Sequence, residues 1–378
     1  MKKRIIATSW HPGGANAILP VIRRLNQEGR ADIVTIGHQY SEKIFGKGGI
    51  EYKTLGSYNL NDVSVDSMFS LLEKESPNIV FTGTSIQDDK NRDTIEHTLT
   101  LAAKGRGIKS LSVLDLWDIN CTKRFRDIYS ESRELKFLPD KIAILDKLCE
   151  ESMLKQGFPK EKLVITGNPY FDELIKLKEQ FGEEDVHRVK SELGIDLDSY
   201  LLFYGASPIE HHYGNEFGYT EKTVLRELLD AVKKLEGRKK ISVIVGVHLR
   251  ANKQDLEQIA EEYKLPVIVS QSYPPRTAIL ASDAVVSSTS TALVESTYLG
   301  KPSISLQPGL KKDDLLITNK LGVTLPVYKH GEIGGVLEKL VFDKNYAAEL
   351  SERGKTKGFG IDGKATERVT DLVYKMLE

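Results

Sequence analysis

A run of small hydroxyl residues, SSTST at positions 287–291, lies between two apolar segments and is followed by Glu295. The apolar segments, 284–286 and 303–306, are typical of buried parallel strands, and Gly300 ends the short helix expected between them. A small-residue turn at a helix start offers backbone N–H groups and the positive end of the helix dipole, which favour phosphate. A carboxylate one turn later can bind a ribose diol. The alternative is a plain strand–helix connection with Glu295 in solvent.

A glycine pair follows the first strand expected in the chain, in the sequence WHPGGAN at 10–16. Gly13 and Gly14 would let a ligand approach the backbone closely, and His11 adds a titratable group beside them. We expect a helix at 17–28, with Pro20 near its first turn. The spacing is not GxGxxG, and no acidic residue follows at the dinucleotide distance, which disfavours a nicotinamide cofactor.

Two carboxylates, Asp115 and Asp118, follow the strand expected at 110–114, and three cations lie within residues 123–126. Carboxylates at a strand end can act as general bases or hold sugar hydroxyls, and nearby cations keep them ionised. Asp118 could instead cap the next helix. The sequence leaves both interpretations open.

The second half of the chain carries small residues and histidines at two further strand ends. Gly205 and Ser207 form a small turn that can receive phosphate, and His211 follows it. His248 and Arg250 come after a later strand and share a face by the two-residue period. Adjacent histidines without a third spaced ligand make a poor metal site. These residues are interpreted as phosphate or sugar contacts, with surface residues or a core histidine as the alternative.

Two parallel sheets are needed to position these groups. Strand patterns recur at 4–8, 33–36, 78–81, 110–114, 141–144 and 163–166, and again at 200–204, 241–247, 266–269, 284–286 and 303–306. Helical segments between several of them, including 220–236 and 253–264, indicate an α/β protein with doubly wound sheets.

A polar helical piece at 176–197 separates the two series of strands. We therefore predict two Rossmann-like domains, 1–175 and 176–362, facing a central cleft at their strand ends. Residues 363–378 form a final helix that can pack back on the first domain.

The bulk composition narrows the functional class. The 378 residues are too many for one ordinary core. The 54 acidic and 53 basic residues nearly cancel, so no overall field would hold nucleic acid or an anionic membrane. Two cysteines are too few for a disulfide framework and fit a reducing cytoplasm, and the N-terminal apolar run is too short for a signal peptide.

Four segments in order resemble the GT-B superfamily of nucleotide-sugar enzymes, especially its UDP-N-acetylglucosamine 2-epimerase and lipid-A-disaccharide synthase branches. The most distinctive is KLVITGNPYFD at 162–172, similar to the junction between the two domains of these enzymes. The others are 138–157, 246–249 and 288–302, the last similar to the donor-binding helix. The TGNP turn could also be a purely structural feature of a domain junction.

The resemblance implies a nucleotide donor in the second domain, with Glu295 on the ribose. It places the diphosphate at Ser290, Thr291 and Ala292, and a second sugar near the glycine pair and the Asp115/Asp118 loop of the first domain. Two motifs depart from the epimerases. They have SGGxxEE where this chain has STSTALVES, and HVEAGLR where it has VLDLWD. These departures favour glycosyl transfer over epimerisation.

We therefore predict a metal-independent transferase without a cofactor, which moves a sugar from a UDP-linked donor to an acceptor hydroxyl in surface-glycan or glycoconjugate synthesis. His11, Asp115 and Asp118 are the candidate bases. The expected partners are the nucleotide sugar and a glycan or lipid-linked acceptor, with no nucleic acid, and a homodimer stays open. The expected location is the cytoplasm, including the inner membrane face. The alternatives are a UDP-N-acetylglucosamine 2-epimerase, hydrolysing or not, and a non-catalytic two-domain binding protein.

Overall fold

The computed structural model describes residues 2–89, 92–117, 121–132, 134–356 and 362–378. It divides into two compact units. Unit 1 comprises Met1–Glu173 and Asp362–Glu378, and unit 2 comprises Leu174–Ile361. The division falls within two residues of the boundary expected from the sequence, and the C-terminal helix belongs to unit 1.

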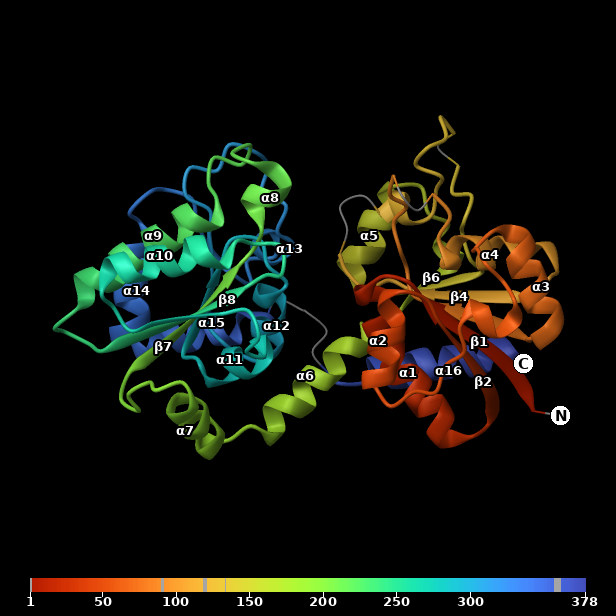
Figure 1. Cartoon of the computed structure of the whole chain (residues 1–378), viewed down its shortest axis with the longest axis horizontal. Helices are drawn as coiled ribbons and strands as arrows, with labels where there is room; N and C mark the ends of the chain where they lie inside the picture. The colour runs from red at the N-terminus through yellow and green to blue at the C-terminus, as the bar shows by residue number, and fades with distance from the viewer. Residues whose placement is uncertain (1, 90–91, 118–120, 133, 357–361) are drawn as a thin grey trace. The chain divides into compact units, whose positions relative to one another are not determined.

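Unit 1 is built on a six-stranded parallel sheet with the order β2-β1-β3-β4-β5-β6 (Figure 1). Its strands are β1 (Lys3–Ser9), β2 (Ala31–Gly37), β3 (Ile79–Thr82), β4 (Lys109–Val113), β5 (Lys141–Ile144) and β6 (Leu163–Ile165). Its α-helices are α1 (Pro12–Glu28), α2 (Tyr40–Lys47), α3 (Val65–Glu75), α4 (Ile95–Gly105), α5 (Lys147–Lys155) and α16 (Ala365–Leu377), while α6 (Pro169–Gln180) crosses the division. Short 3-10 helices occupy Leu55–Tyr58, Cys121–Arg124 and Lys160–Lys162.

Helices cover both faces of the unit 1 sheet because its strands alternate between two apolar clusters. Ile5 and Phe81 pack on one face with α1 and α16, and Ile6 and Val80 pack on the other with α3 and α4. The alternation follows the two-residue period of a strand. This double burial is typical of a parallel sheet.

Helix α1 begins at Pro12, five residues before the predicted start. The prediction placed Pro20 in the first turn, and this is wrong, since Pro20 lies inside the helix and is buried. A proline there removes one backbone hydrogen bond, to the carbonyl four residues earlier. The packing of Ile18 and Ile22 against the sheet outweighs this local cost.

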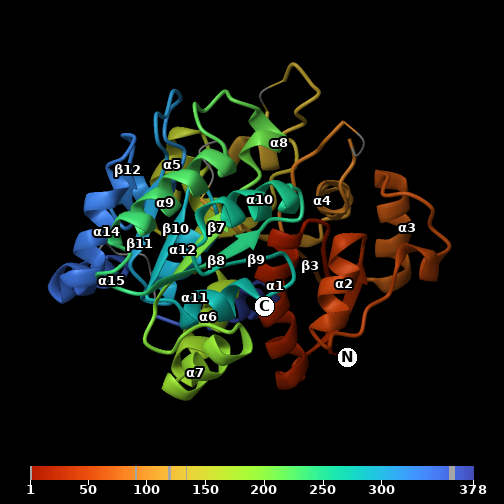
Figure 2. The same cartoon turned by 60° about the vertical axis from the view of Figure 1, so that its left-hand side comes forward.

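Unit 2 repeats the architecture with a second six-stranded parallel sheet in the order β12-β11-β10-β7-β8-β9. Its strands are β7 (Tyr200–Ala206), β8 (Ile241–Val247), β9 (Val267–Ser270), β10 (Ala284–Ser287), β11 (Ser303–Leu306) and β12 (Leu325–Val327). Its helices are α7 (Glu183–Glu192), α8 (Ile209–Tyr213), α9 (Glu221–Leu235), α10 (Lys253–Tyr263), α11 (Pro275–Ala281), α12 (Ala292–Tyr298), α13 (Ile317–Lys320), α14 (Ile333–Phe342) and α15 (Lys344–Thr356). Figure 2 shows these helices on both faces of the sheet.

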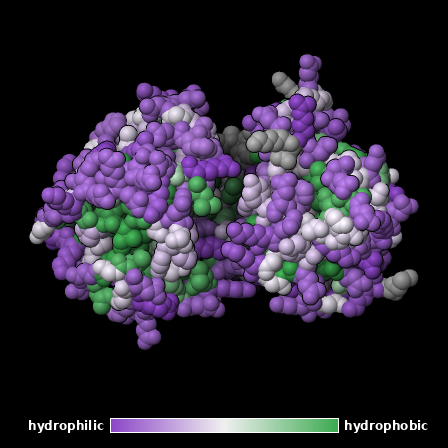
Figure 3. Space-filling model, viewed as in Figure 1, coloured by the Kyte–Doolittle hydropathy of each residue, from purple (hydrophilic) through white to green (hydrophobic). Residues whose placement is uncertain are grey.

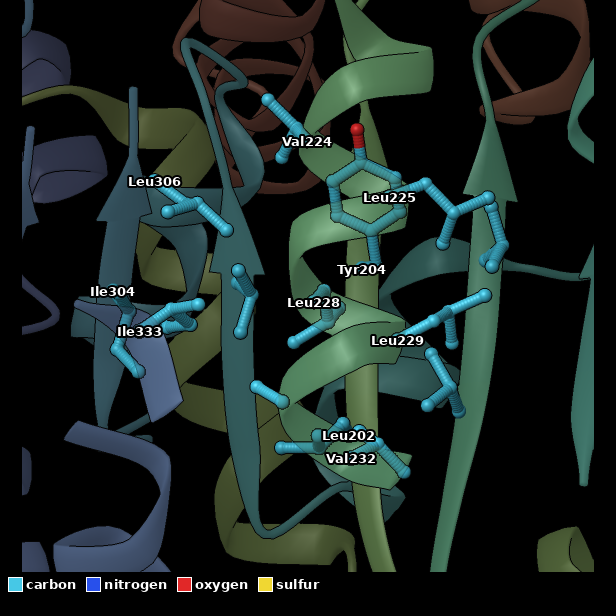
Figure 4. Packing of buried hydrophobic residues seen from close by; sticks show 14 of the residues in the cluster. Leu202, Tyr204, Val224, Leu225, Leu228, Leu229, Val232, Ile304, Leu306 and Ile333 are labelled. Atoms are coloured by element: carbon cyan, nitrogen blue, oxygen red, sulfur yellow. The ribbon is translucent and has the colours of Figure 1, made fainter. Parts of the chain in front are cut away.

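The core of unit 2 forms where α9 lies across β7 (Figure 4). Leu225, Leu228 and Leu229 of α9 point toward Leu202 and Tyr204 of the strand. The Tyr204 hydroxyl is buried and donates to the Glu221 carbonyl over 2.8 Å, so its polar end is satisfied.

The visible face of each unit is mostly hydrophilic, and apolar residues appear on it in small groups (Figure 3). Among the helices in the described ranges, none combines the length and the apolar character that crossing a membrane requires.

Candidate functional site

The carboxyl ends of β1 and β3 carry a buried hydrogen-bond network in unit 1, centred on Glu96 of α4. Glu96 is buried, with 3% of its surface exposed, and its side chain contacts the turn after β1. Its Oε1 accepts hydrogen bonds from Ser9 Oγ over 3.0 Å, Trp10 N over 2.8 Å and Ser85 Oγ over 2.6 Å. One carboxylate oxygen thus ties two strand-end loops together.

Asp115 follows β4, and hydrogen bonds fix the position of its carboxylate as they do for Glu96. Its Oδ1 accepts from Arg124 Nη1 over 2.9 Å and from Thr84 Oγ1 over 3.2 Å. The two side chains of the ion pair are only 8% and 10% exposed. The Asp115 carbonyl also accepts from Asn168 Nδ2 over 2.7 Å, which joins the TGNP turn to this network. Asp118 lies outside the described residues.

His11 is partly exposed and interacts electrostatically with both of these carboxylates. Its backbone N–H donates to Ser85 Oγ over 3.4 Å, and its ring lies 4.0 Å from that of Trp10. Burial lowers the pKa of His11 from its usual value, Glu96 opposes that shift, and Arg124 adds to it. The imidazole is therefore largely neutral at pH 7 and can accept a proton.

Protein atoms fill the space beside the glycine pair. A Cβ on Gly13 would lie 1.9 Å from Asp115 Oδ2, and one on Gly14 would lie 2.6 Å from Ser9 Oγ and 2.9 Å from Thr84 N. The absent side chains thus allow the loops after β1, β3 and β4 to pack together. From the sequence, Gly13 and Gly14 were instead predicted to leave this space for a ligand.

In unit 2, the strand ends surround an open pocket of about 470 Å³. It lies at the ends of β7, β8 and β9, beside α8 and the start of α12. All the unit 2 residues predicted to bind substrate line this pocket except His211 and Arg250, namely Gly205, Ser207, His248, Ser290, Thr291, Ala292 and Glu295. His212, which was not predicted, lines it as well.

His211, His212, His248 and Arg250 form a basic cluster, of which His212 and His248 line the pocket. The Arg250 backbone N–H donates to His248 Nδ1 over 3.1 Å. Burial lowers the pKa of His248, and so do the neighbouring Arg250, His212 and His211. The pKa of His212 is lowered for the same reasons, with burial again the largest. A bound anion would offset this repulsion and favour the protonated histidines.

The hydroxyl groups around the pocket are only partly satisfied. Ser207 Oγ is buried and has no hydrogen-bond partner within the described ranges. Ser290 Oγ accepts from Ala292 N over 3.1 Å, so it already caps one of the N–H groups at the start of α12. A ligand can therefore gain a hydrogen bond from Ser207 at little cost to the protein.

Glu295 is buried, with 9% of its surface exposed, which is at odds with a solvated side chain on a plain connection. Both Nε and Nη2 of Arg276, on α11, lie 3.4 Å from Glu295 Oε1. This ion pair keeps the carboxylate in place beside the pocket. A ribose at Glu295 would share the carboxylate with Arg276.

Sequence reasoning missed Glu96 and Arg276. The available signal for Glu96 was a carboxylate within an apolar stretch, since Ile95, Leu99 and Ala103 of the same helix are buried. For Arg276, no pattern in the neighbouring sequence indicated that it would pair with Glu295. Within the described ranges, no cluster of His, Cys, Asp or Glu side chains has a composition that could hold a metal ion.

No protein-family profile matches the chain, and no curated protein does. Solved structures do match over nearly the whole length. A UDP-GlcNAc 2-epimerase from Neisseria meningitidis bound to UDP-GlcNAc matches with a TM-score of 0.71 at 18% identity, covering 99% of this chain and 100% of the other. A glycosyltransferase from Rickettsia africae matches with a TM-score of 0.66 at 13% identity, covering 100% and 99%.

A third match is Anabaena HepE in complex with UDP-glucose, with a TM-score of 0.63 at 11% identity, covering 98% of this chain and 99% of the other. The two sheets and these matches define the GT-B fold. Within that fold the chain resembles the 2-epimerase branch in structure, at identities so low that the likeness concerns the fold.

Proposed function

We propose that this protein is a glycosyltransferase that moves a sugar from a UDP-linked donor to an acceptor hydroxyl. The observation that carries the proposal is the unit 2 pocket, which combines the buried carboxylate Glu295, the Ser207 hydroxyl that has no partner in the described ranges, and His212 and His248 of the basic cluster. The carboxylate can accept hydrogen bonds from a ribose diol, and the hydroxyl can donate to a phosphate oxygen. The basic residues can balance the negative charge of a diphosphate. Matched structures contain UDP-GlcNAc or UDP-glucose, which supports the choice of donor.

In the proposed reaction the acceptor oxygen attacks the anomeric carbon of the donor sugar. A C–O bond to the acceptor forms, the C–O bond to the diphosphate breaks, and UDP leaves with the bonding electrons. Charge develops on the diphosphate as it leaves, and cationic groups placed beforehand stabilise it. Arg250 is the permanent cation of the basic cluster, and His248 lines the pocket, where a bound diphosphate would favour its protonated form.

The hydroxyl proton must go to a base, and unit 1 offers His11 as the better candidate. Asp115 Oδ1 already accepts from Arg124 and Thr84. His11 has a lowered pKa and is partly exposed, so a neutral imidazole is available near pH 7. We assign the proton transfer to His11.

The second candidate function is UDP-N-acetylglucosamine 2-epimerisation, because several of the matched structures are enzymes of that name. An epimerase needs no acceptor, and this difference separates the two functions. The experiment incubates the protein with UDP-GlcNAc or UDP-glucose, with and without a panel of glycan acceptors, and follows the products by NMR. UDP release that depends on an acceptor supports transfer, a C2 epimer formed from the donor alone supports epimerisation, and turnover of neither donor overturns both.

Binding gives a second test of the pocket. We expect Glu295→Ala to weaken UDP binding by about 1–3 kcal/mol, because a charge-assisted hydrogen bond to the ribose is lost. Titration calorimetry measures the change. Glu227→Ala is the matched control, since this α9 carboxylate bonds His330 and the Gly331 N–H and does not line the pocket. Equal UDP affinity in wild type and Glu295→Ala would remove Glu295 from the site.

A further inference from the structure

A charged side chain lies among the buried residues of α4. Glu96 is 3% exposed, and its neighbours on the helix, Ile95, Leu99 and Ala102, are fully buried. Burying a carboxylate costs free energy unless other groups compensate it. The contacts of Glu96 show what the protein gains from keeping it there.

These contacts converge on His11. Ser9 and Trp10, which donate to Glu96 Oε1, directly precede His11 in the chain. Ser85, the third donor, accepts the backbone N–H of His11 with the same oxygen that donates to Glu96. The carboxylate therefore fixes the turn that carries His11 from two directions.

Among the described residues, no cation forms an ion pair with Glu96. Its Oε2 is buried and has no hydrogen-bond partner within the described ranges. The contrast is Glu75, another buried carboxylate of unit 1, which bonds Tyr58 and pairs with Arg4 and Lys53. The charge of an unpaired carboxylate acts more strongly on its surroundings at low dielectric.

His11 is among the groups that feel this charge. The charged groups that act on it are Glu96 of α4, Asp88 and Asp115 from the strand-end loops, and Arg124 of the following 3-10 helix. The three carboxylates raise its pKa, whereas burial and Arg124 lower it. Glu96 is the largest of the contributions that raise it.

We infer that Glu96 is a positioning residue that holds His11 in place and keeps its imidazole basic enough to take the proton of the acceptor hydroxyl. The inference rests on the proposed function, in which His11 is the base. When the hydroxyl proton moves to the imidazole nitrogen, a cation forms beside the unpaired carboxylate, which stabilises it. A base oriented by a third group is a recurring arrangement in proton transfer.

The first test needs no substrate. The ring protons of His11 are followed by NMR across pH in the full-length protein, and their assignment comes from the spectrum of His11→Asn. We expect the pKa of His11 to fall in Glu96→Gln, because the isosteric amide keeps an acceptor for the three donors but removes the charge. Glu75→Gln is the matched control and should leave the His11 pKa unchanged.

The second test measures the reaction. We expect Glu96→Gln to lower kcat by about tenfold or more, with KM for the UDP-sugar within about twofold, because the residue acts on proton transfer and not on the donor. The acid limb of the pH–rate profile should move to lower pH with the His11 pKa. Glu75→Gln should change neither kcat nor the profile.

The two tests separate the inference from the proposed function. An unchanged His11 pKa in Glu96→Gln overturns the positioning role whatever reaction the protein catalyses. A lowered pKa in a protein that turns over no sugar nucleotide supports the positioning role and contradicts the proposed function. If Glu96→Gln does not fold, Glu96→Asp is used in its place. Its side chain is one methylene shorter, so the charge lies farther from His11. A folded Asp variant must then show a smaller fall in the His11 pKa, and no fall overturns the inference.

Discussion

The two units share a sheet topology but differ at the edge where their strands end. In unit 1 the polar groups at this edge are bound to one another, with Glu96 accepting three hydrogen bonds and Asp115 paired with Arg124. In unit 2 the same edge encloses a pocket of about 470 Å³, in which Ser207 Oγ has no partner in the described ranges. Unit 1 also has a pocket at this edge, of about 530 Å³ and lined in part by Trp10, His38 and Gln39. The two edges therefore differ in how firmly their polar groups are bound to one another.

The largest effect expected from this contrast concerns the buried ion pair of unit 1. Arg124→Leu leaves Asp115 buried without its cation, and we expect a loss of about 3–5 kcal/mol in the free energy of unfolding. Denaturant unfolding followed by tryptophan fluorescence measures this change. Both tryptophans, Trp10 and Trp117, lie in unit 1, so the signal reports that unit alone.

The matched variant in unit 2 is Arg276→Leu. Its pair with Glu295 is longer, at 3.4 Å, and the Arg276 side chain is 24% exposed. Water can therefore replace part of the lost interaction, and the loss should be less than half of that for Arg124→Leu. Far-UV circular dichroism follows both units, and comparison with the tryptophan transition of unit 1 isolates the transition of unit 2. Losses of equal size would contradict the proposed difference between the two edges.

A smaller effect is expected from filling the space at glycines. Gly14→Ala places a Cβ 2.9 Å from the Thr84 backbone nitrogen, which cannot move without its strand-end loop. We expect a loss of about 1–3 kcal/mol, as for other overpacked sites.

Gly205→Ala is the counterpart at the pocket. Its Cβ would meet Ala292 Cβ and Ser287 Oγ at 3.4 Å, an ordinary contact distance. Its stability should stay within about 0.5 kcal/mol of wild type. The two variants are compared by denaturant unfolding under the same conditions. A stable Gly14→Ala protein would show that the unit 1 edge is looser than its packing indicates.

The sequence predicted the strands well because their signal is local. The segment 241–247 is mostly apolar and rich in β-branched residues, and β8 covers the same range. By contrast, β12 was missed, since it has only three residues and contains Pro326. The start of α1 was misplaced because Pro20 was given more weight than the packing of its neighbours.

The candidate site likewise contains residues with a local sequence signal and residues without one. Ser290 and Glu295 were predicted to lie together because they are only five residues apart after one strand, and both line the pocket. The partners of Glu96 could not be predicted, since its donors at positions 9 and 10 lie 87 and 86 residues away in the chain. Such partners come together only through the order of the strands in the sheet, here β1 beside β3.

The smallest effect we expect is a difference in acid sensitivity between the units. His11, His38 and His97 of unit 1 all have pKa values lowered mainly by burial, and His97 is stacked on Phe137. A folded pKa below the unfolded value means that the unfolded chain binds more protons, so stability rises with pH. This contribution is complete above the unfolded pKa of 6.5 and is lost as pH falls below it, toward the lowered folded values.

The denaturation midpoint from tryptophan fluorescence should therefore fall when the pH goes from 7.5 to 5. The midpoint of unit 2 should fall less, because His212 and His248 are exposed. His97→Gln should reduce the pH dependence of unit 1, since glutamine does not titrate and can still bond the Arg124 carbonyl that His97 Nε2 contacts. His330→Gln, at an exposed position of unit 2, is the control. If His97→Gln and wild type lose stability equally on acidification, burial of His97 does not set the acid limit of unit 1, and His11 and His38 become the groups to replace next.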